Sequence, residues 1–557
     1  MRSYMSQKQW MMVLLISLAG LAAADVGPTW IEQWGIRWTF DKNISLNGAP
    51  NTYRYGQFVN GDYWVVGPVN ITGISPEFRI GDGATEFEGW AVPDGWHING
   101  SMINPRAMVS TQGYTYNSVY GSYNSALNVG IGVSGETPLA VPVGSSLVST
   151  KSRSRTGPGG GQGGSDSDVK TAAVLTVLAE APPADSFRPP YCGLVKTLYR
   201  ADNLQRERLT SLTSVSGTPN IEDVAALFQK PWICHLGGWS GKYIFPVDSI
   251  PTNYGREIHR DIGIAALMLN LDYTEEQKEP LLINFVQRGI DLYGIVADGG
   301  ITHWGANGGH MGGRKWPILF AGLMLDDAAM KGVGAKSGAY LYSAKPGGGN
   351  YGPGGGYGCP VPLNRPSDYI HFGEDDQTFH IAQLDVDLTD TSGPYGDVWR
   401  PDTRDAAFIP YPSSDIGVPE WGVGHALRPH VSNYHYSAAY RSVATLPFAG
   451  TALAALIMNA KTLWNHDAYF DYTDRHMTLT ASGGEWSGKI GRTNSAFLTA
   501  MWDTYRADYG PIWPSKASAG TGNNAPVIAP ISAKTVTAGQ KLEFVVMATD
   551  ADNDVLS

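Results

Sequence analysis

Short runs of alternating apolar and polar residues fill the chain from Thr29 to about Leu178. The stretch YRYGQFVNGDYWVVGPVNITGISP is typical, because its aromatic and β-branched residues are separated by Gly, Pro, Asn and Asp. A period of two places successive side chains on opposite faces of a strand, and the turn residues end each run. The pattern predicts a β-rich domain over residues 25–188. Inside it, residues 149–170 have little to bury and predict a loop, after which TAAVLTVLAEAP predicts another strand.

Beyond Pro189 the apolar residues recur at helical spacing instead. Helices are predicted in segments 220–231, 255–272, 274–300, 313–332, 434–461, 464–481 and 492–510. Asn220 is a start signal for the first segment, and Thr274 with Gln277 forms a capping-box pattern for the third. Long loops rich in Gly, Trp, Tyr and His join these segments. We therefore expect paired helices that form a ring or bundle over residues 189–513, with the loops gathered at one end.

The first 24 residues form a different kind of segment. Arg2 and Lys8 precede an apolar run, and small alanines lead up to Ala24. This arrangement predicts a signal peptide cleaved after Ala24 and therefore a secreted protein with no membrane span in its mature form. The alternative is an uncleaved anchor, although the run is short for a bilayer span.

A polar stretch at 514–525 predicts a linker before the last segment, 526–557. That segment, with its acidic turn ATDADND, resembles the opening strands of cadherin-like and immunoglobulin-like repeats. Because the chain stops before such a module closes, we expect an incomplete β-sandwich module. Its turn offers Asp550, Asp552 and Asp554 as ligands for a structural Ca²⁺ ion, and the sequence requires no other cofactor. The fold class is therefore multidomain α+β.

Composition narrows the range of partners. The chain has 557 residues, 43% of them hydrophobic, and a formal net charge of −11 with scattered acidic residues. A phosphate backbone would be repelled, so the sequence argues against nucleic-acid binding. Only 3 cysteines occur, which allows one disulfide at most. Cys192 with Cys234 is the pair we expect, because Cys359 lies in a glycine-rich insertion.

The densest polar and aromatic stretch is HWGANGGHMGGRKWP, which begins at His303. Asn307 and His310 lie three positions apart among glycines, and Arg314 and Lys315 open the next helix. Glycines let backbone and short side chains approach a ligand closely, while Trp304 offers a flat face for a sugar ring. This cluster suits an anionic polysaccharide; the alternative is a set of packing and turn residues.

Two further stretches combine histidine, tyrosine and arginine. NYHYSAAYR places His435 beside Tyr436 and puts Tyr436 and Tyr440 on one helical face, with Arg441 following. Histidine and tyrosine together can remove and return a proton, and a nearby cation favours the phenolate. NYGREIHR contains Tyr254, Arg256 and His259 near the start of another helix. Packing aromatics and solvated charges are the alternative interpretations.

On these residues the helical block resembles the (α/α) toroid polysaccharide lyases, which include alginate, glucuronan and heparinoid lyases. The resemblance rests on the signal peptide, the rhythm of helix pairs, NGGHMGGRKW and NYHYSAAYR. It implies a secreted enzyme that cleaves a uronic-acid polysaccharide by β-elimination. In such lyases an Asn or Arg neutralises the uronate carboxylate, a His or Tyr removes the C5 proton, and a Tyr protonates the leaving oxygen.

Carried onto this sequence, the resemblance implies four catalytic residues: Asn307, His310, Tyr436 and His435. The substrate-binding residues that it implies are Tyr254, Arg256, His259, Trp304, Arg314, Lys315, Tyr440 and Arg441. No metal ligand is expected among them. Arg256 and Arg441 suit neighbouring uronates or sulfates, since a guanidinium meets a carboxylate in two parallel hydrogen bonds.

Two alternatives remain open. The first is a glycoside hydrolase on the same ring of helices, which would use two carboxylates. Asp298 is one candidate, and HFGEDDQTFH supplies Glu374, Asp375 and Asp376. The second alternative is a secreted carbohydrate-binding protein without catalytic activity, in which aromatic residues would line a shallow groove.

Overall fold

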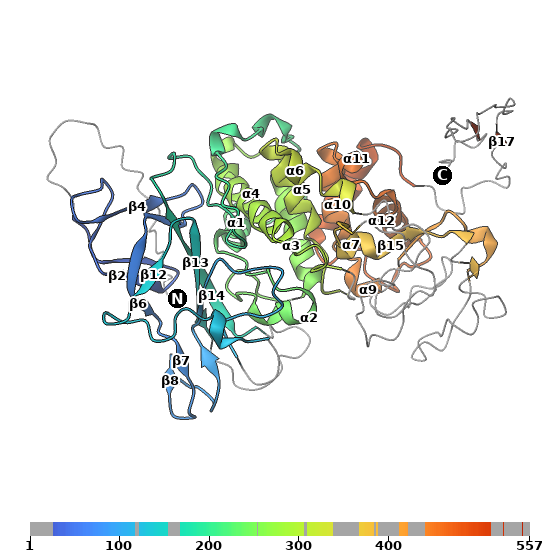
Figure 1. Cartoon of the computed structure of the whole chain (residues 1–557). Helices are drawn as coiled ribbons and strands as arrows, with labels where there is room; N and C mark the ends of the chain where they lie inside the picture. The colour runs from blue at the N-terminus through green and yellow to red at the C-terminus, as the bar shows by residue number, and fades with distance from the viewer. Residues whose placement is uncertain are drawn as a thin grey trace, which may run out of the picture. The chain divides into compact units, whose positions relative to one another are not determined.

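A computed structural model gives the fold of the chain (Figure 1). It describes residues 26–116, 122–153, 167–252, 254–305, 309–337, 367–383, 386–387, 411–421, 441–513, 527–528 and 548–549. The chain divides into two compact units, one of residues 1–156 and 168–202 and the other of residues 157–167 and 203–557. The first is rich in strands and the second in helices, so the protein is mixed α+β, as the sequence predicts.

The β-rich unit contains two main sheets. The smaller has the order β1 (Trp30–Gln33), β2 (Ile36–Phe40), β6 (Val69–Ser75), β12 (Leu139–Val141). The larger has the order β11 (Ser101–Ile103), β13 (Ser145–Ser152), β14 (Val169–Leu178), β5 (Tyr63–Val66), β4 (Tyr53–Gln57), β3 (Ile44–Ser45). β13 and β14 pair in antiparallel fashion across the segment predicted as a loop. The strand predicted after that segment is confirmed as β14, but the predicted loop is too long, because β13 extends to Ser152 and β14 already begins at Val169.

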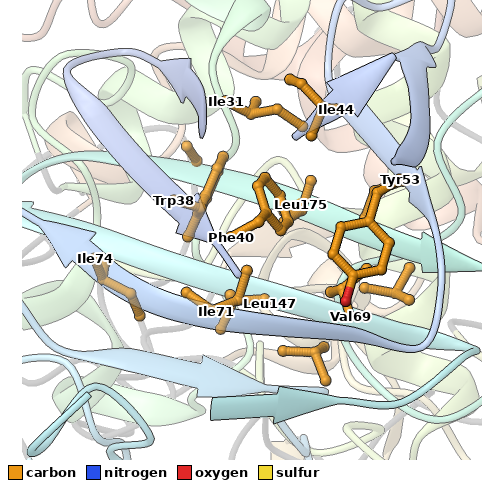
Figure 2. Packing of buried hydrophobic residues seen from close by; sticks show 14 of the residues in the cluster. Ile31, Trp38, Phe40, Ile44, Tyr53, Val69, Ile71, Ile74, Leu147 and Leu175 are labelled. Atoms are coloured by element: carbon orange, nitrogen blue, oxygen red, sulfur yellow. The ribbon is translucent and has the colours of Figure 1, made fainter. Parts of the chain in front are cut away.

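Side chains from both sheets form one hydrophobic core (Figure 2). Trp38 and Phe40 point inward from β2, where alternate positions are buried as a half-buried strand requires. Leu147 and Leu175 contribute from β13 and β14. The Trp38 indole nitrogen donates a hydrogen bond to Ser149 Oγ at 3.0 Å, which ties the two sheets together.

Two small antiparallel pairs complete the strands of this unit. They are β7 (Arg79–Ile80) with β10 (His97–Ile98), and β8 (Glu86–Phe87) with β9 (Trp90–Ala91).

The helical unit contains all the longer helices of the described residues. They are α1 (Ile221–Gln229), α3 (Gly255–Met268), α4 (Glu275–Ala297), α5 (Lys315–Met324), α10 (Phe448–Ile457), α12 (Asp467–Leu479) and α13 (Ala496–Tyr505). Short helices α2 (Gly238–Gly241), α6 (Ala328–Lys331), α7 (Gly373–Asp376), α9 (Arg441–Ala444) and α11 (Lys461–Trp464) lie between them. α4 packs against α1 and α5 (Figure 1), and α10 packs against α3, α12 and α13.

The predicted helix starts are confirmed where capping residues signalled them. The Asn220 side chain accepts hydrogen bonds from the backbone N–H groups of Glu222 and Asp223 at the start of α1. Thr274 and Gln277 form the complete capping box of α4. These local hydrogen bonds satisfy N–H groups that have no partner inside the helix.

Two predicted helices are each divided in the structure. The segment 313–332 forms α5 and α6, because the Asp327 side chain caps a new helix by accepting the Met330 N–H at 2.8 Å. Within 434–461, α9 ends at Ala444 and α10 begins after Pro447. Proline has no N–H to continue a helix, which explains this break. Residues 434–440 lie outside the described residues.

Two further predictions concern sequence features outside the helices. Cys192 and Cys234 are buried thiols and do not share a disulfide, so the predicted pair is wrong. In the C-terminal segment, β17 (Val527–Ile528) pairs with β18 (Ala548–Thr549), while Asp550, Asp552 and Asp554 lie outside the described residues. Within the described ranges, no helix combines the length and apolar composition that a bilayer span requires.

A small sheet lies next to α12 in the helical unit. It pairs β15 (Thr378–His380) with β16 (Pro419–Trp421) in antiparallel fashion. The short helix α7 leads directly into β15, so the acidic residues of α7 are held close to α12.

Candidate functional site

The glycine-rich loop before α5 lies against the first turn of α3. A Cβ atom at Gly309 would overlap the Tyr254 side chain, which would have to shift to admit it. Gly313 has a φ of +89°, and a Cβ there would lie 2.7 Å from His259 Cα. Both a left-handed backbone and a close contact therefore require glycine at this position. The glycines of the motif thus bring residues 309–314 onto α3.

This contact brings Tyr254, Arg256 and His310 together, and we call these three residues the tyrosine–histidine cluster. The rings of Tyr254 and His310 meet edge to face, with centroids 4.5 Å apart. The Arg256 guanidinium carbon lies 5.8 Å from the centre of the Tyr254 ring, within the range of a cation–π contact. All three side chains are half-buried. A phenol, an imidazole and a cation are therefore adjacent and still accessible to solvent.

The backbone of α3 holds this cluster in place. Tyr254 is the N-cap residue, and its carbonyl oxygen accepts the N–H groups of Glu257 and Ile258 at 3.1 and 3.2 Å. Arg256 Nε donates to Glu257 Oε1 at 2.6 Å, which orients the guanidinium. The positive end of the helix macrodipole and Arg256 together favour an anionic group here.

A second group of charged residues lies deeper, and we call Lys315, Glu374 and Asp375 the lysine cluster. Lys315 Nζ donates to Asp375 Oδ2 at 2.5 Å and to the carbonyl oxygen of Trp464 at 2.6 Å. The Trp464 indole donates to the other Asp375 oxygen at 2.8 Å. Each member of the cluster is 0% exposed. Burial lowers the pKa of Lys315, while the charge of Asp375 opposes that shift.

Glu374 connects the lysine cluster to the glycine-rich loop. Its carboxylate accepts the backbone N–H of Gly313 at 3.1 Å and that of Lys315 at 3.4 Å. Burial, and after it the nearby charge of Asp375, raises the pKa of Glu374 to about 7. The third acid of this helix, Asp376, instead accepts from His371 Nδ1 at 2.9 Å and from the Tyr369 hydroxyl at 3.3 Å.

His259, Arg314 and Trp304 are buried beside the loop. His259 is 1% exposed, and its Nε2 lies 2.6 Å from Thr451 Oγ1. Burial lowers the pKa of His259 to about 3, with a further contribution from Arg314, so the ring is neutral at pH 7. Arg314 Nη1 donates to the Gly312 carbonyl at 2.6 Å. Trp304 stacks on Phe372 with ring centroids 6.1 Å apart. These positions favour packing roles over direct contact with a polymer.

Arg441 is also buried, at 0% exposure, and its Nη2 donates to Glu420 Oε1 at 2.5 Å. Its guanidinium carbon lies 4.8 Å from the centre of the Trp486 ring. Burial is the largest single influence and lowers the pKa of Arg441, but the charges of Glu420, Tyr472 and Tyr411 and the hydrogen bond to Glu420 together outweigh it, so the pKa is raised. As with Lys315, an internal carboxylate pairs with the cation.

Several predicted residues cannot be placed relative to these groups. Asn307, His435, Tyr436 and Tyr440 lie outside the described residues. The described part of the chain contains no group of three or more His, Cys, Asp and Glu side chains that would hold a metal ion.

The sequence interpretation missed two relations. Tyr254 was assigned to substrate binding, but it is the ring that contacts His310. The run of glycines signalled a close approach without indicating which residue would be approached. Glu374 appeared only as a candidate hydrolase carboxylate, although it accepts two backbone hydrogen bonds from the loop. No local signal indicates that pairing, because the partners are 61 and 59 positions apart in the chain.

Comparisons with family models, curated proteins and solved structures find no match for this chain.

Proposed function

We propose that the protein is a secreted polysaccharide lyase that cleaves a uronic-acid polymer by β-elimination. The observation that carries the proposal is the tyrosine–histidine cluster, in which half-buried Tyr254 and His310 rings are 4.5 Å apart beside Arg256. In this proposal the helical unit is an (α/α) toroid and the partner is an anionic polysaccharide.

Before a base can remove the C5 proton, the negative charge of the neighbouring uronate carboxylate must be compensated. A proton next to a carboxylate is only weakly acidic until the charge of that carboxylate is compensated. Arg256, whose charge is partly offset by its ion pair with Glu257, and the N-terminus of α3 supply positive charge next to Tyr254. We assign neutralisation of the uronate carboxylate to Arg256, with Asn307 as a further donor predicted from the sequence.

The two rings then divide the proton transfers. The imidazole of His310 takes the C5 proton, and the electrons of that C–H bond form the C4–C5 double bond. The C4–O bond breaks, and the Tyr254 hydroxyl gives its proton to the leaving oxygen. The tyrosinate then recovers a proton from the imidazolium, directly or through water. Tyr436 and His435, predicted from the sequence for the same transfers, are the alternative pair.

The carboxylates of the hydrolase alternative are placed less favourably. Glu374 and Asp375 are 0% exposed and Asp376 is 2% exposed. Each is engaged by the backbone, by Lys315 or by His371. A glycosidase acid must reach the glycosidic oxygen, and its partner must reach the sugar or a water. Asp298 is half-buried, but a hydrolase that used it would need a second accessible acid, and none of these three is one.

The test is ultraviolet absorbance of the unsaturated uronate during incubation with alginate, glucuronan, pectate and glycosaminoglycans. We expect a rise that is lost in Tyr254→Phe and in His310→Ala. Tyr273→Phe is the matched control, because Tyr273 is a half-buried tyrosine before α4 and outside the cluster. New reducing ends without absorbance would indicate a hydrolase instead. Binding without either signal would indicate a carbohydrate-binding protein.

A further inference from the structure

The loop that carries His310 packs against the start of α7. The Phe372 backbone pairs with that of Trp304 in a parallel bridge, and the Gly373 backbone lies against Met311 and Gly312. Directly after these contacts comes Glu374, which is fully buried. Its carboxylate accepts the backbone N–H groups of Gly313 and Lys315.

We propose that Glu374 is a positioning residue for the tyrosine–histidine cluster: its carboxylate holds the backbone on either side of Arg314 and thereby places His310 against Tyr254. This inference rests on the proposed function for its catalytic consequence. Its structural part, the hold on the loop, stands on the two hydrogen bonds alone.

Neighbouring acids of the same helix do not share this role. Asp375 is occupied by Lys315 Nζ and the Trp464 indole, and Asp376 is occupied by His371 and Tyr369. Glu374 is itself fixed, because the Thr378 hydroxyl donates to its carbonyl oxygen at 2.8 Å. Among the three acids of α7, it is the one whose side chain bonds to the loop backbone within the described residues.

The surroundings of Glu374 determine how its charge affects the loop. Facing groups come from α7 itself, from α5 and from the region around α12. They are Asp375, Lys315 and Tyr469. Desolvation is the largest influence and raises the pKa of Glu374 to about 7, outweighing the Gly313 hydrogen bond and Lys315, which lower it.

The sign of the pH effect follows from this order of influences. If the loop opens and admits water, the pKa of Glu374 returns toward its ordinary value of 4.5. Glu374 therefore binds its proton more tightly when the loop is closed than when it is open. Ionisation favours opening, so the loop is held most firmly below about pH 4.5 and loosens as the pH rises from there to about 7.

Hydrogen exchange of the peptide that spans residues 309–315 tests this proposal in the full-length protein. Gln at position 374 keeps one acceptor oxygen and has no charge. We expect Glu374→Gln to speed exchange of the Gly313 and Lys315 amides by about tenfold near pH 4.5, where Glu374 is protonated in the closed loop, the loss of roughly one hydrogen bond. Wild-type exchange, corrected for its intrinsic pH dependence, should rise between about pH 4.5 and about pH 7 and level off above that, and the variant should lack that rise.

Asp376→Asn is the matched control, since Asp376 belongs to the same helix and is equally buried but bonds to His371. It should leave exchange of the 309–315 peptide at the wild-type rate. Unchanged exchange in Glu374→Gln would overturn the proposal. So would equal acceleration in both variants, because that result would indicate general loosening of α7.

Kinetics separate the positioning role from the proposed function. If the protein eliminates uronates, Glu374→Gln should lower kcat at least about tenfold with little change in KM, because only the placement of His310 changes. If the protein eliminates nothing, the exchange experiment still decides whether Glu374 holds the loop. Elimination that depends on Tyr254, together with unchanged loop exchange in Glu374→Gln, would sustain the function and reject the positioning role.

Discussion

The tyrosine–histidine cluster and the lysine cluster share one loop but differ in what surrounds them. His310 is half-buried and meets Tyr254, whereas Lys315, a few residues later, is fully buried in an ion pair with Asp375. A buried ammonium needs a carboxylate because removing it from water is costly. The difference shows that polar residues in one motif serve separate purposes: those at the surface can meet a ligand, while those inside hold the loop in position.

The largest effect that this comparison predicts is for Lys315→Met. The substitution leaves the Asp375 carboxylate buried without its cation, which should lower the free energy of unfolding by about 3–5 kcal/mol. Lys336→Met is the control, because Lys336 and Asp368 form an exposed pair, 53% and 59% accessible, worth at most about 1 kcal/mol. Urea unfolding curves would give the free energy of unfolding of both variants. Equal losses would mean that burial does not make the Lys315–Asp375 pair more important for stability than an exposed pair.

The pH dependence of stability tests the lysine cluster through Glu374. The pKa of Glu374 in the folded protein is raised from 4.5 to about 7, so its stabilising contribution is present at low pH and is lost as the pH rises through about 7. Relative to Glu374→Gln, the wild type should lose about 3 kcal/mol between pH ~4 and pH ~8. Unfolding free energies measured across this range would reveal it. If the free energy of unfolding depended on pH in the same way in both proteins, the burial of Glu374 would not affect the pH dependence of stability.

A smaller loss is expected where the loop contacts α3. Gly313→Ala should cost about 2–3 kcal/mol, because alanine is strained at a φ of +89° and its Cβ would press on His259. Gly488→Ala separates the two causes, since Gly488 has a φ of +72° with no atom within 4 Å of the added Cβ. It should cost only about 1 kcal/mol. Thermal unfolding would measure the loss of stability in each variant. Similar losses would mean that the loop can move away from His259 at little cost.

The smallest effect on stability is expected at the tyrosine–histidine cluster itself. Tyr254→Phe and His310→Ala should each change the free energy of unfolding by less than about 1 kcal/mol, because both side chains are half-buried. Turnover of a uronate polymer should nevertheless fall by roughly 10²–10⁴-fold, as expected for loss of an acid or base. Urea unfolding combined with the absorbance assay measures both. A stability loss as large as that of Lys315→Met would identify the rings as packing residues.

The local parts of the fold were predictable from the sequence. The capping box of Thr274 and Gln277 and the N-cap Asn220 mark helix starts that the structure confirms. The breaks at Asp327 and Pro447 were missed, although both residues are recognisable helix-starting or helix-interrupting types. Apolar periodicity continued across both positions and concealed them.

The candidate site was predictable only as a group of polar and aromatic residue types. The motif that begins at His303 contains His310 and Lys315 alike, and its composition does not distinguish an accessible imidazole from a buried ammonium. The predicted disulfide failed for a related reason: the count of cysteines limits the possibilities, but only the positions of the thiols decide the pairing.

By itself, the sequence determined the β-rich and helical regions, the capped helix starts and the stretch that had to lie close to a neighbour. Hydrogen bonds between nearby residues and side-chain periodicity are properties of local sequence. Only the tertiary structure decided that Tyr254 meets His310, that Asp375 pairs with Lys315 and that Glu374 holds Gly313. Those contacts join distant segments, and burial, which sets the cost of each charge, depends on the whole packed unit.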